Sequence, residues 1–333
     1  MRILIVSDAW YPQVNGVVRT LDTLRGKLEQ AGNTVRMVTP AEFKTLPCPT
    51  YPEIRLALAR PARVRQMIES FMPCAIHIAT EGPLGIITRH YCRKKGHPFT
   101  TAYHTRFPEY VTARVPVPLS WGYRFMRWFH DASSAVMVAT DTIEQDLRGR
   151  GFTNIRRWTR GVDTDLFHPR NDRDFLNLPR PIHLYVGRVA VEKSVEDFLR
   201  LDLPGTKLVV GDGPQRAPLQ QKYPDTVFAG MKEGEDLARH YAAADVFVFP
   251  SRTDTFGLVL LEALASGVPV AALPVPGPLD VIDGSPAGVL DDDLGKAIAG
   301  AMEIPPNICR DHALTYSWDA SVRQFLENLH VFR

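Results

Sequence analysis

Short apolar runs alternate along the chain with longer segments in which apolar residues recur at helical spacing. Ile3–Val6 is a continuous apolar run, and Val17–Ala31 follows it with helical spacing and ends at Gly32. A second series of the same kind begins at Ile182–Val186. This alternation is typical of parallel α/β units, because a crossover between two parallel strands usually contains a helix. The pattern therefore predicts an α/β protein with two Rossmann-like domains.

The other expected strands follow the same pattern in both series. They are Val35–Val38, Ala75–Ile78 and Ala135–Val138 in the first series, and Lys207–Val210, Val227–Phe228, Val246–Phe249 and Val268–Ala272 in the second. A polar, proline-bearing segment, Phe167–Asp174, separates the two series and is the expected linker. We therefore expect an N-terminal domain over residues 1–170 and a C-terminal domain over residues 171–315. Ligands of such folds bind at the carboxyl ends of the strands, so the two sheets are expected to face an interdomain cleft.

The segment with the clearest chemistry follows the strand Val246–Phe249. Asp254 and Glu262 stand eight positions apart, across a Thr-Phe-Gly turn that leads into the apolar helical run Leu258–Ala265. A turn that opens a helix presents unpaired N–H groups and a partial positive charge, which suit a phosphate. Carboxylates accept hydrogen bonds from hydroxyls, so the pattern predicts a nucleotide-sugar site. A glycosidase also uses two acids, but here one acid lies inside a helix behind the turn, which favours binding.

Three other strand ends carry glycines or cations. No GxGxxG follows the first strand, which disfavours a nicotinamide or flavin site, but Gly16 precedes a helix where backbone can approach a phosphate closely. Arg188 and Lys193 follow the strand Ile182–Val186, and a guanidinium with an ammonium group forms a diphosphate clamp. Gly211 begins a tight turn where backbone could meet a base or ribose. Each of these signals, taken alone, also fits an ordinary loop.

Seven short motifs are distributed along nearly the whole chain, in the same order as in a known enzyme family. They are Gln13–Val17, Tyr103–Thr105, Arg160–Asp163, Gly187–Arg188 with Glu192–Lys193, Gly211–Gly213, Phe228–Gly230 and Pro250–Gly267. With these motifs the chain resembles the family 4 glycosyltransferases of GT-B architecture. That family usually has glutamate at the first acidic position of its E-x7-E motif, where this chain has Asp254. Aspartate keeps the charge but shortens the reach, so the resemblance leaves the exact contacts to the donor sugar open.

The resemblance implies a role for each matching residue. The implied catalytic residues are His104, Arg188, Lys193 and Asp254. The implied donor-binding residues are Gly16, Arg188, Lys193, Gly211, Asp254, Phe256, Gly257, Leu258 and Glu262. Glu262 would hold the ribose hydroxyls, Asp254 would contact the sugar, and His104 would lie near the donor sugar and the acceptor. The family also implies a last helix around Trp318–Leu329, within residues 316–333, that crosses back to the first domain.

The implied reaction is a retaining transfer of a hexosyl group from a UDP- or GDP-sugar to a hydroxyl acceptor. In the mechanism usually proposed for the family, no covalent intermediate forms and the diphosphate leaving group helps to take the acceptor proton. The nucleoside diphosphate sugar is then a co-substrate, with no tightly bound cofactor and no required metal. Alternatives are a transferase of envelope polysaccharide or lipopolysaccharide assembly, a sugar-nucleotide epimerase or hydrolase, and a non-catalytic binding module.

Charge and aromatic residues point to a lipid acceptor. Residues 1–170 contain 24 Lys and Arg against 14 Asp and Glu, a net charge of +10, whereas residues 171–333 carry −8. The segment Leu119–His130 adds aromatic and basic side chains at helical spacing, namely Trp121, Arg124, Phe125, Arg127 and Trp128. Such a helix suits an anionic membrane surface, although a core helix that lines the acceptor cleft is the alternative. The resemblance to sulfoquinovosyl-diacylglycerol synthases and phosphatidylinositol mannosyltransferases favours a lipid such as diacylglycerol.

Several function classes are disfavoured. No nucleic-acid motif accompanies the basic half, and the four cysteines have no paired spacing, which fits a reducing compartment. Asp163-Thr164-Asp165 has the form of a metal-binding DxD motif but precedes the linker and is interpreted as a turn. The chain start resembles a buried strand more than a signal peptide. We therefore expect a cytoplasmic protein, peripheral on the inner face of the cytoplasmic membrane.

Overall fold

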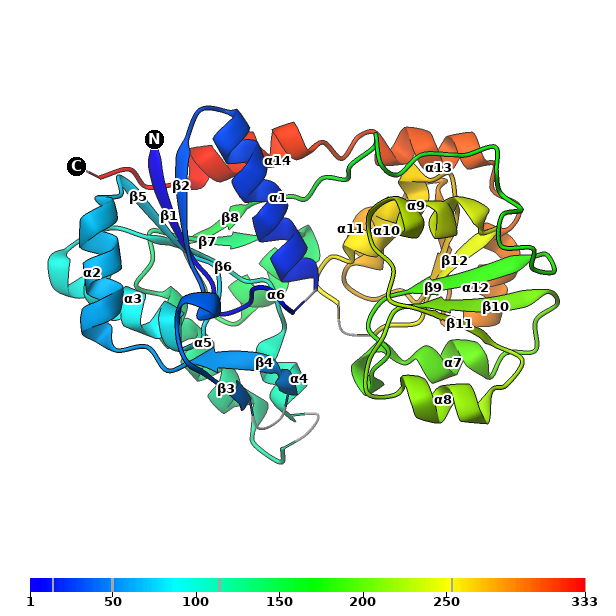
Figure 1. The fold of residues 1–333 in the computed structure, drawn as a ribbon, viewed down its shortest axis with the longest axis horizontal. Helices are drawn as coiled ribbons and strands as arrows, with labels where there is room; N and C mark the ends of the chain where they lie inside the picture. Colours follow the sequence, from blue (N-terminus) through cyan, green and yellow to red (C-terminus); the bar gives the residue numbers. More distant parts are fainter. Residues whose placement is uncertain (14, 49–50, 113–114, 253, 333) are drawn as a thin grey trace. The chain divides into compact units, whose positions relative to one another are not determined.

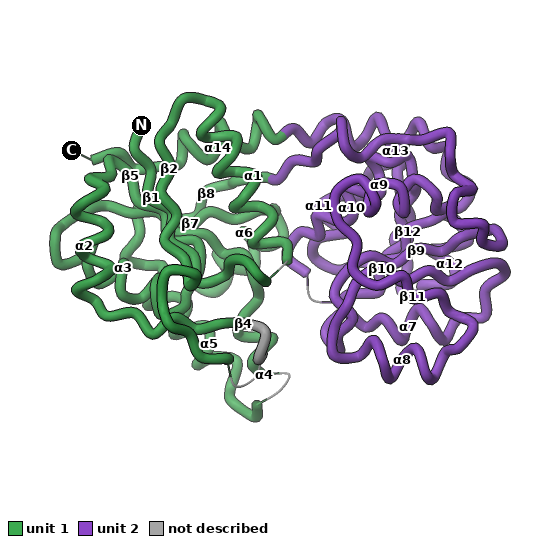
Figure 2. Tube along the Cα trace, in the orientation of Figure 1, with its two compact units in different colours: residues 1–159, 318–333 green, residues 160–317 purple. Residues whose placement is uncertain are grey.

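The computed structural model describes residues 1–13, 15–48, 51–112, 115–252 and 254–332. The chain divides into two compact units (Figure 2): unit 1 contains residues 1–159 and 318–333, and unit 2 contains residues 160–317. Each unit has its own six-stranded parallel sheet with helices between successive strands (Figure 1). The prediction of an α/β protein with two parallel-sheet domains is therefore confirmed.

The sheet of unit 1 has the strand order β2-β1-β5-β6-β7-β8. Its strands are β1 (Arg2–Val6), β2 (Thr34–Val38), β5 (Ala75–Ile78), β6 (Thr100–Ala102), β7 (Ala135–Val138) and β8 (Ile155–Arg157). Its helices are α1 (Gly16–Gln30), η1 (Pro40–Glu42), α2 (Pro61–Phe71), α3 (Pro83–Lys95), α4 (Phe107–Thr112), α5 (Leu119–His130), α6 (Asp141–Gly149) and α14 (Trp318–Asn328). A separate antiparallel hairpin contains β3 (Thr45–Cys48) and β4 (Tyr51–Ala57).

Strand β1 is apolar at consecutive positions because both faces of its sheet are covered. Ile3 and Ile5 pack in one cluster with α1 and α14, whereas Leu4 and Val6 pack on the other face with α2. The last helix is thus part of the core of unit 1. The Trp158 indole donates to Ser321 Oγ at 3.1 Å, and its ring lies 5.1 Å from the Phe325 ring.

The sheet of unit 2 has the strand order β11-β10-β9-β12-β13-β14. Its strands are β9 (Ile182–Val186), β10 (Thr206–Val210), β11 (Val227–Gly230), β12 (Val246–Phe249), β13 (Val270–Ala272) and β14 (Gly288–Leu290). Its helices are η2 (Val191–Lys193), α7 (Val195–Leu199), α8 (Arg216–Lys222), α9 (Gly234–Ala243), α10 (Leu258–Ala265), α11 (Pro278–Ile282), α12 (Leu294–Ala301) and α13 (Pro306–Ala313).

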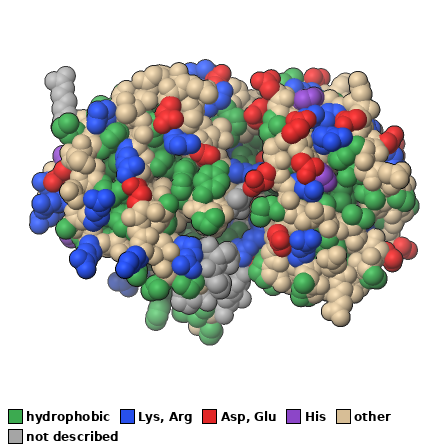
Figure 3. Space-filling view, viewed as in Figure 1, with side chains coloured by type: hydrophobic (Ala, Val, Ile, Leu, Met, Phe, Trp, Pro, Cys, Tyr) green, Lys and Arg blue, Asp and Glu red, His purple; other side chains and the backbone are tan. Residues whose placement is uncertain are grey.

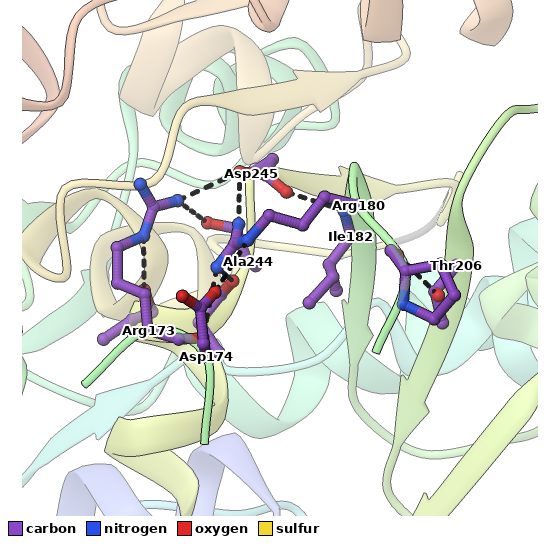
Figure 4. Close-up of polar contacts among 10 residues, drawn as sticks. Arg173, Asp174, Arg180, Ile182, Thr206, Ala244 and Asp245 are labelled. Atoms are coloured by element: carbon purple, nitrogen blue, oxygen red, sulfur yellow. Dashed lines mark hydrogen bonds and ion pairs between the residues drawn. The ribbon is translucent and has the colours of Figure 1, made fainter. Parts of the chain in front are cut away.

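The segment expected to be a linker is held against unit 2. Asp245 Oδ1 accepts hydrogen bonds from Arg173 at 3.1 Å and Arg180 at 2.6 Å, and its Oδ2 accepts from the Ile182 N–H at 2.7 Å (Figure 4). Arg310 donates to the backbone oxygen of Phe167 at 2.6 Å. These bonds explain why the division falls between residues 159 and 160, whereas the sequence pattern placed it at residue 170.

Element positions follow the hydrophobic pattern closely in both units. Four expected strands have the observed bounds, namely Ala75–Ile78, Ala135–Val138, Ile182–Val186 and Val246–Phe249. The strand expected at Val268–Ala272 begins two residues later, at Val270. The first helix ends at Gln30, and Gly32 has a φ of +79°, a left-handed conformation that favours glycine. Within the described part of the chain, no helix combines the length and apolar character needed to span a bilayer.

Candidate functional site

The candidate site of unit 2 is built on neighbouring parallel strands. Strands β10, β9 and β12 are adjacent in the sheet, so their carboxyl ends meet at one edge. Arg188 and Lys193 follow β9, Gly211 follows β10, and Asp254 follows β12. Sheet topology thus brings to one edge residues that are far apart in the sequence.

Lys193 and Asp254 form an ion pair at this edge. The Lys193 ammonium donates to Asp254 Oδ1 at 2.5 Å, and the two side chains are 20% and 17% exposed. The other carboxylate oxygen, Asp254 Oδ2, is buried and accepts no hydrogen bond from the described residues. A buried carboxylate oxygen without a donor is unfavourable. The arrangement therefore offers an acceptor that a ligand hydroxyl can satisfy.

Arg188 lies on a turn that the side chain of Tyr185 supports. The Tyr185 hydroxyl donates to the backbone oxygen of Arg188 at 2.8 Å, and burial raises the pKa of Tyr185 well above its usual value, so the hydroxyl stays neutral. Gly187 between them has a φ of +153°, and a Cβ there would lie 2.8 Å from the Tyr185 hydroxyl. The guanidinium of Arg188 lies 3.4 Å from Glu192. Both basic groups of the expected diphosphate clamp thus face an acid in this structure.

Glu262 lies in the middle of α10 and is almost completely buried, with 7% of its surface exposed. Tyr241, on α9, donates its hydroxyl to Glu262 Oε2 at 2.8 Å. A buried carboxylate is costly unless it is hydrogen-bonded, and a neutral hydroxyl donor supplies such a bond without cancelling the charge. The Tyr241 hydroxyl therefore fixes the position of one carboxylate oxygen of Glu262.

The start of α10 has the backbone geometry of an anion site. Gly257, its N-cap residue, has a φ of +80° and gives no side-chain cap, and Leu258 begins the helix. Phe256 is buried and shapes the turn. Since the first N–H groups of a helix have no partner inside the helix, they and the helix dipole attract a negative group.

Gly211 has a packing role that the sequence did not show. A Cβ at Gly211 would lie 1.9 Å from the backbone oxygen of Gly187, so the loops after β9 and β10 touch through their backbones. The N–H of Gly211 donates to Gly230 O at 2.8 Å. Because this N–H is already used, a contact of Gly211 with a base or ribose must involve other atoms of the residue.

Unit 1 contains two other expected site residues. Gly16 begins α1, where Asn15 Oδ1 already accepts from the Val18 N–H at 3.0 Å, and a Cβ at Gly16 would meet no atom of the described residues within 4 Å. Open space beside this glycine leaves room for a ligand. His104 follows β6, is half-buried, and lies edge-on to Trp158 at 5.7 Å between ring centroids.

A buried carboxylate in unit 1, Asp8, was not among the expected site residues. It follows β1 and accepts from the N–H groups of Leu84 at 2.8 Å and Gly85 at 3.1 Å, at the start of α3. Burial raises the pKa of Asp8 to about 6, although these hydrogen bonds favour its ionised form. The position of an acid directly after a buried strand was the available signal.

Helix α5 presents the aromatic and basic face that the spacing predicted. Trp121 and Trp128 are 69% and 46% exposed, and Arg124 and Arg127 are exposed beside them. Phe125 is half-buried, with its ring 5.7 Å from that of Trp128. The opposite face of the helix packs into unit 1 through Tyr123, Met126 and Phe129, which are all buried. The helix therefore covers a core and also exposes aromatic surface.

The acidic motifs outside the site serve as local caps. Asp163 Oδ1 accepts from the N–H groups of Asp165 and Leu166, which makes the DxD sequence a turn, as predicted. Asp293 caps α12 in the same way. Among the described residues, no three histidine, cysteine or acidic side chains gather closely enough to suggest a metal site.

The fold and these motifs define the class as a GT-B glycosyltransferase. A family model described as Glycosyltransferase Family 4 matches residues 14–166, and one described as Glycosyl transferases group 1 matches residues 180–303. The chain is 30% identical over 315 residues to a GDP-mannose-dependent alpha-mannosyltransferase of Mycobacterium tuberculosis (strain CDC 1551 / Oshkosh), with 87% of this chain and 83% of that protein covered. The chain belongs to glycosyltransferase family 4.

The names of other relatives indicate several different substrates. The chain is 30% identical to a sulfoquinovosyl transferase of Arabidopsis thaliana, covering 84% of this chain and 60% of that protein. It is 25% identical to an alpha-monoglucosyldiacylglycerol synthase of Streptococcus pneumoniae (strain ATCC BAA-255 / R6), covering 100% and 85%. Among solved structures, the sucrose-phosphate synthase of Thermosynechococcus elongatus is similar, with a TM-score of 0.80, 25% identity, and 98% and 97% of the two chains covered.

Proposed function

We propose that this glycosyltransferase moves a hexosyl group from a UDP- or GDP-sugar to a hydroxyl of a membrane lipid such as diacylglycerol, with retention of configuration. The observation that carries the proposal is the Lys193–Asp254 pair, in which the buried Asp254 Oδ2 accepts no hydrogen bond from any described residue. Asp254 follows β12 and precedes the start of α10, where Gly257 offers no side-chain cap, so a cation, a hydroxyl acceptor and the first amides of a helix belong to one sheet edge. That combination suits a sugar linked to a diphosphate.

The proposed donor roles follow from the chemistry of each group. Arg188 binds the diphosphate with paired guanidinium hydrogen bonds, and Lys193 binds it through the compact charge of its ammonium group. The amides of Phe256, Gly257 and Leu258 add neutral donors around the phosphates and the sugar. Asp254 Oδ2 accepts a hydrogen bond from a sugar hydroxyl, and the carboxylate of Glu262 accepts hydrogen bonds from the ribose hydroxyls. Gly16 and Gly211 contribute backbone surface to the donor.

The proposed catalysis depends on charge stabilisation in place of a covalent intermediate. Negative charge develops on the diphosphate as the glycosidic bond breaks, and Arg188 and Lys193 stabilise that charge. The departing phosphate oxygen takes the acceptor proton, while His104 hydrogen-bonds to the donor sugar. These cations and the amides of α10 supply the positive charge, so we propose that no metal is required. Loss of one charged contact should raise the barrier by ~2–4 kcal/mol, or roughly 10²–10³ in rate.

The lipid acceptor is supported by a relative and by a surface. The name of one relative, alpha-monoglucosyldiacylglycerol synthase, contains a lipid acceptor. In this chain, Trp121, Phe125 and Trp128 lie on the outer face of α5 with Arg124 and Arg127. Aromatic side chains insert at the level of lipid headgroups, and arginines attract anionic lipid. We propose that this face brings the enzyme to the inner face of the cytoplasmic membrane.

A donor panel tests the site. A ligand of the folded state raises the melting temperature in proportion to ln(1 + [L]/Kd), so the true donor should stand out among UDP-, GDP- and ADP-sugars. Lys193→Ala and Glu262→Ala should abolish most of this shift. Lys222→Ala is a matched control, because Lys222 also pairs with an acid at 2.5 Å but on an exposed helix. Equal shifts in all variants would contradict the donor assignment.

Product analysis tests the reaction itself. Release of nucleoside diphosphate only when diacylglycerol is present identifies a lipid transferase, and nuclear magnetic resonance of the glycolipid gives the anomeric configuration. Release without an acceptor would indicate a hydrolase. Release with a soluble or lipid-linked glycan, but not with diacylglycerol, would move the enzyme to envelope polysaccharide assembly. An inverted product would refute retention.

A further inference from the structure

We propose that unit 1 has a second binding site, for a phosphate group, in a cavity between the amino end of its sheet and α2. The cavity has a volume of about 350 Å³. It is lined by Arg2, Arg36, Arg63, Gln66, Met67, Ser70 and Phe71. Among the described residues, three arginines and no acidic residue line it, and the volume falls in the range of small-molecule sites.

The arginines converge because of strand register and helix spacing. Arg36 on β2 lies in register with Leu4 on β1, and Leu4 packs on the face of the sheet that α2 covers. Arg2 stands two positions before Leu4 and therefore points to the same face. Arg63 lies in α2, which covers that face. Three separate elements thus deliver one positive charge each.

Each guanidinium is held in place by a neighbour. Arg2 donates through Nε to Phe71 O at 2.8 Å, donates again through Nη2, and lies 4.6 Å from the centre of the Phe71 ring. Arg36 pairs with Glu42, and Arg63 Nη1 donates to Gln66 Oε1 at 3.2 Å. A guanidinium has five N–H groups. Among the described residues, these contacts use a minority of the donors, so ordered donors remain for a ligand.

The charge balance of the cavity favours a multiply charged anion. Glu42 offsets one of the three positive charges, which leaves an excess of two. Arginine binds phosphate with parallel hydrogen bonds, and Gln66 and Ser70 add neutral polar groups of the kind that bind phosphate esters. Figure 3 also shows many Lys and Arg side chains on the surface of unit 1. A phosphate monoester or a phospholipid headgroup has the required charge and size.

The cavity lies at the opposite end of the unit 1 sheet from the residues that follow the carboxyl ends of its strands. Arg2 is the first residue of β1, whereas Asp8 follows the other end of that strand. Six residues of extended chain span roughly 20 Å. The phosphate site therefore does not depend on the proposed transfer reaction, and either proposal can fail without the other.

The test compares two double variants of the full chain. Arg36→Gln with Arg63→Gln removes two charges from the cavity, and Arg60→Gln with Arg65→Gln removes two charges from the same helix region outside its lining. Binding of inorganic phosphate and of sn-glycerol 3-phosphate is measured by calorimetry at constant ionic strength. We expect at least tenfold weaker binding in the cavity variant and near-normal binding in the control. If the double variant is unstable, Arg63→Gln alone is measured in its place, because Arg63 is exposed, and it should also weaken phosphate binding.

Vesicles distinguish a headgroup from a free phosphate compound. The same proteins are sedimented with phosphatidylcholine vesicles, with and without phosphatidic acid. Stronger loss of binding to phosphatidic acid in the cavity variant than in the control assigns the site to a lipid headgroup. Equal losses, with the calorimetric difference retained, assign it to a soluble phosphate compound. No phosphate binding by the native protein, or equal binding by both double variants, would overturn the site.

Discussion

Replacing Tyr241 by phenylalanine isolates one bond at the proposed ribose position. The change removes only the hydroxyl that donates to Glu262 Oε2 at 2.8 Å and keeps the ring, which contacts Phe167 and Phe247. Glu262 is 7% exposed, so little water can replace the lost donor. We therefore expect Tyr241→Phe to destabilise unit 2 and to weaken donor binding.

The size of the effect follows from the burial of the carboxylate. A hydrogen bond to a charged group contributes about 1.5–3 kcal/mol. For a unit of this size, residues 160–317, about 2–4 °C of melting temperature corresponds to 1 kcal/mol. The expected decrease is therefore about 3–12 °C. Because the carboxylate loses one of the bonds that orient it toward the ribose, the KM for the donor should rise roughly tenfold while kcat changes less.

The assay compares melting curves and steady-state kinetics with a matched control. Tyr223→Phe removes another tyrosine hydroxyl that donates to a glutamate, Glu196, at 3.0 Å, but that glutamate is 26% exposed and lies outside the candidate site. It should leave the donor KM unchanged. An unchanged donor KM in Tyr241→Phe, with the expected loss of stability, would show that Glu262 has a purely structural role.

Three other predictions concern pH, stability and the membrane. The pKa of Asp8 is about 6 in the folded protein against an ordinary value of 3.8, so the folded state holds the Asp8 proton more tightly than the unfolded state does. As pH rises through 4–6, loss of this proton reduces the free energy of unfolding by up to about 3 kcal/mol. Chemical denaturation should therefore show the native protein losing stability relative to Asp8→Asn from pH 4 to pH 7, and a constant difference would refute this. Asp245→Ala should reduce the unfolding free energy of unit 2 by about 2 kcal/mol, because three donors lose a partly exposed partner, and denaturant titration measures the loss. Trp121→Ser with Trp128→Ser should weaken sedimentation with anionic vesicles but leave the melting temperature nearly unchanged, and unchanged sedimentation would remove the membrane role of α5.

The fold was predictable because its strands are buried on both faces. Four strands were predicted with their observed bounds, since each is a mainly apolar run, interrupted only by His77 in β5 and His183 in β9. Strands β6, β8 and β14 have three residues each and were not predicted, whereas β13, equally short, was found because it lies in the longer apolar run Val268–Ala272. The predicted boundary between the units differs from the observed one because a polar segment usually indicates a linker. Here that segment belongs to unit 2, where Arg173 and Arg180 bind Asp245.

The candidate site was only partly visible in the sequence. Spacing and motif order predicted Lys193, Asp254 and Glu262 as site residues, because these residue types follow strand ends or a phosphate turn. Their partners were not visible, since the contact of Tyr241 with Glu262 depends on the packing of α9 against α10. The packing role of Gly211 was missed for the same reason, as it depends on the backbone of a loop more than twenty residues earlier.

The position of α14 affects the order in which the protein can fold. Residues 318–333 complete the core of unit 1, although all of unit 2 is translated before them. On the ribosome, unit 2 can therefore reach its native state while unit 1 still lacks the helix that covers Trp158. During that interval unit 1 exposes apolar surface that a chaperone can recognise. A fragment that ends at residue 159 should accordingly be prone to aggregation, whereas the same fragment with residues 318–333 attached through a short linker should be more soluble.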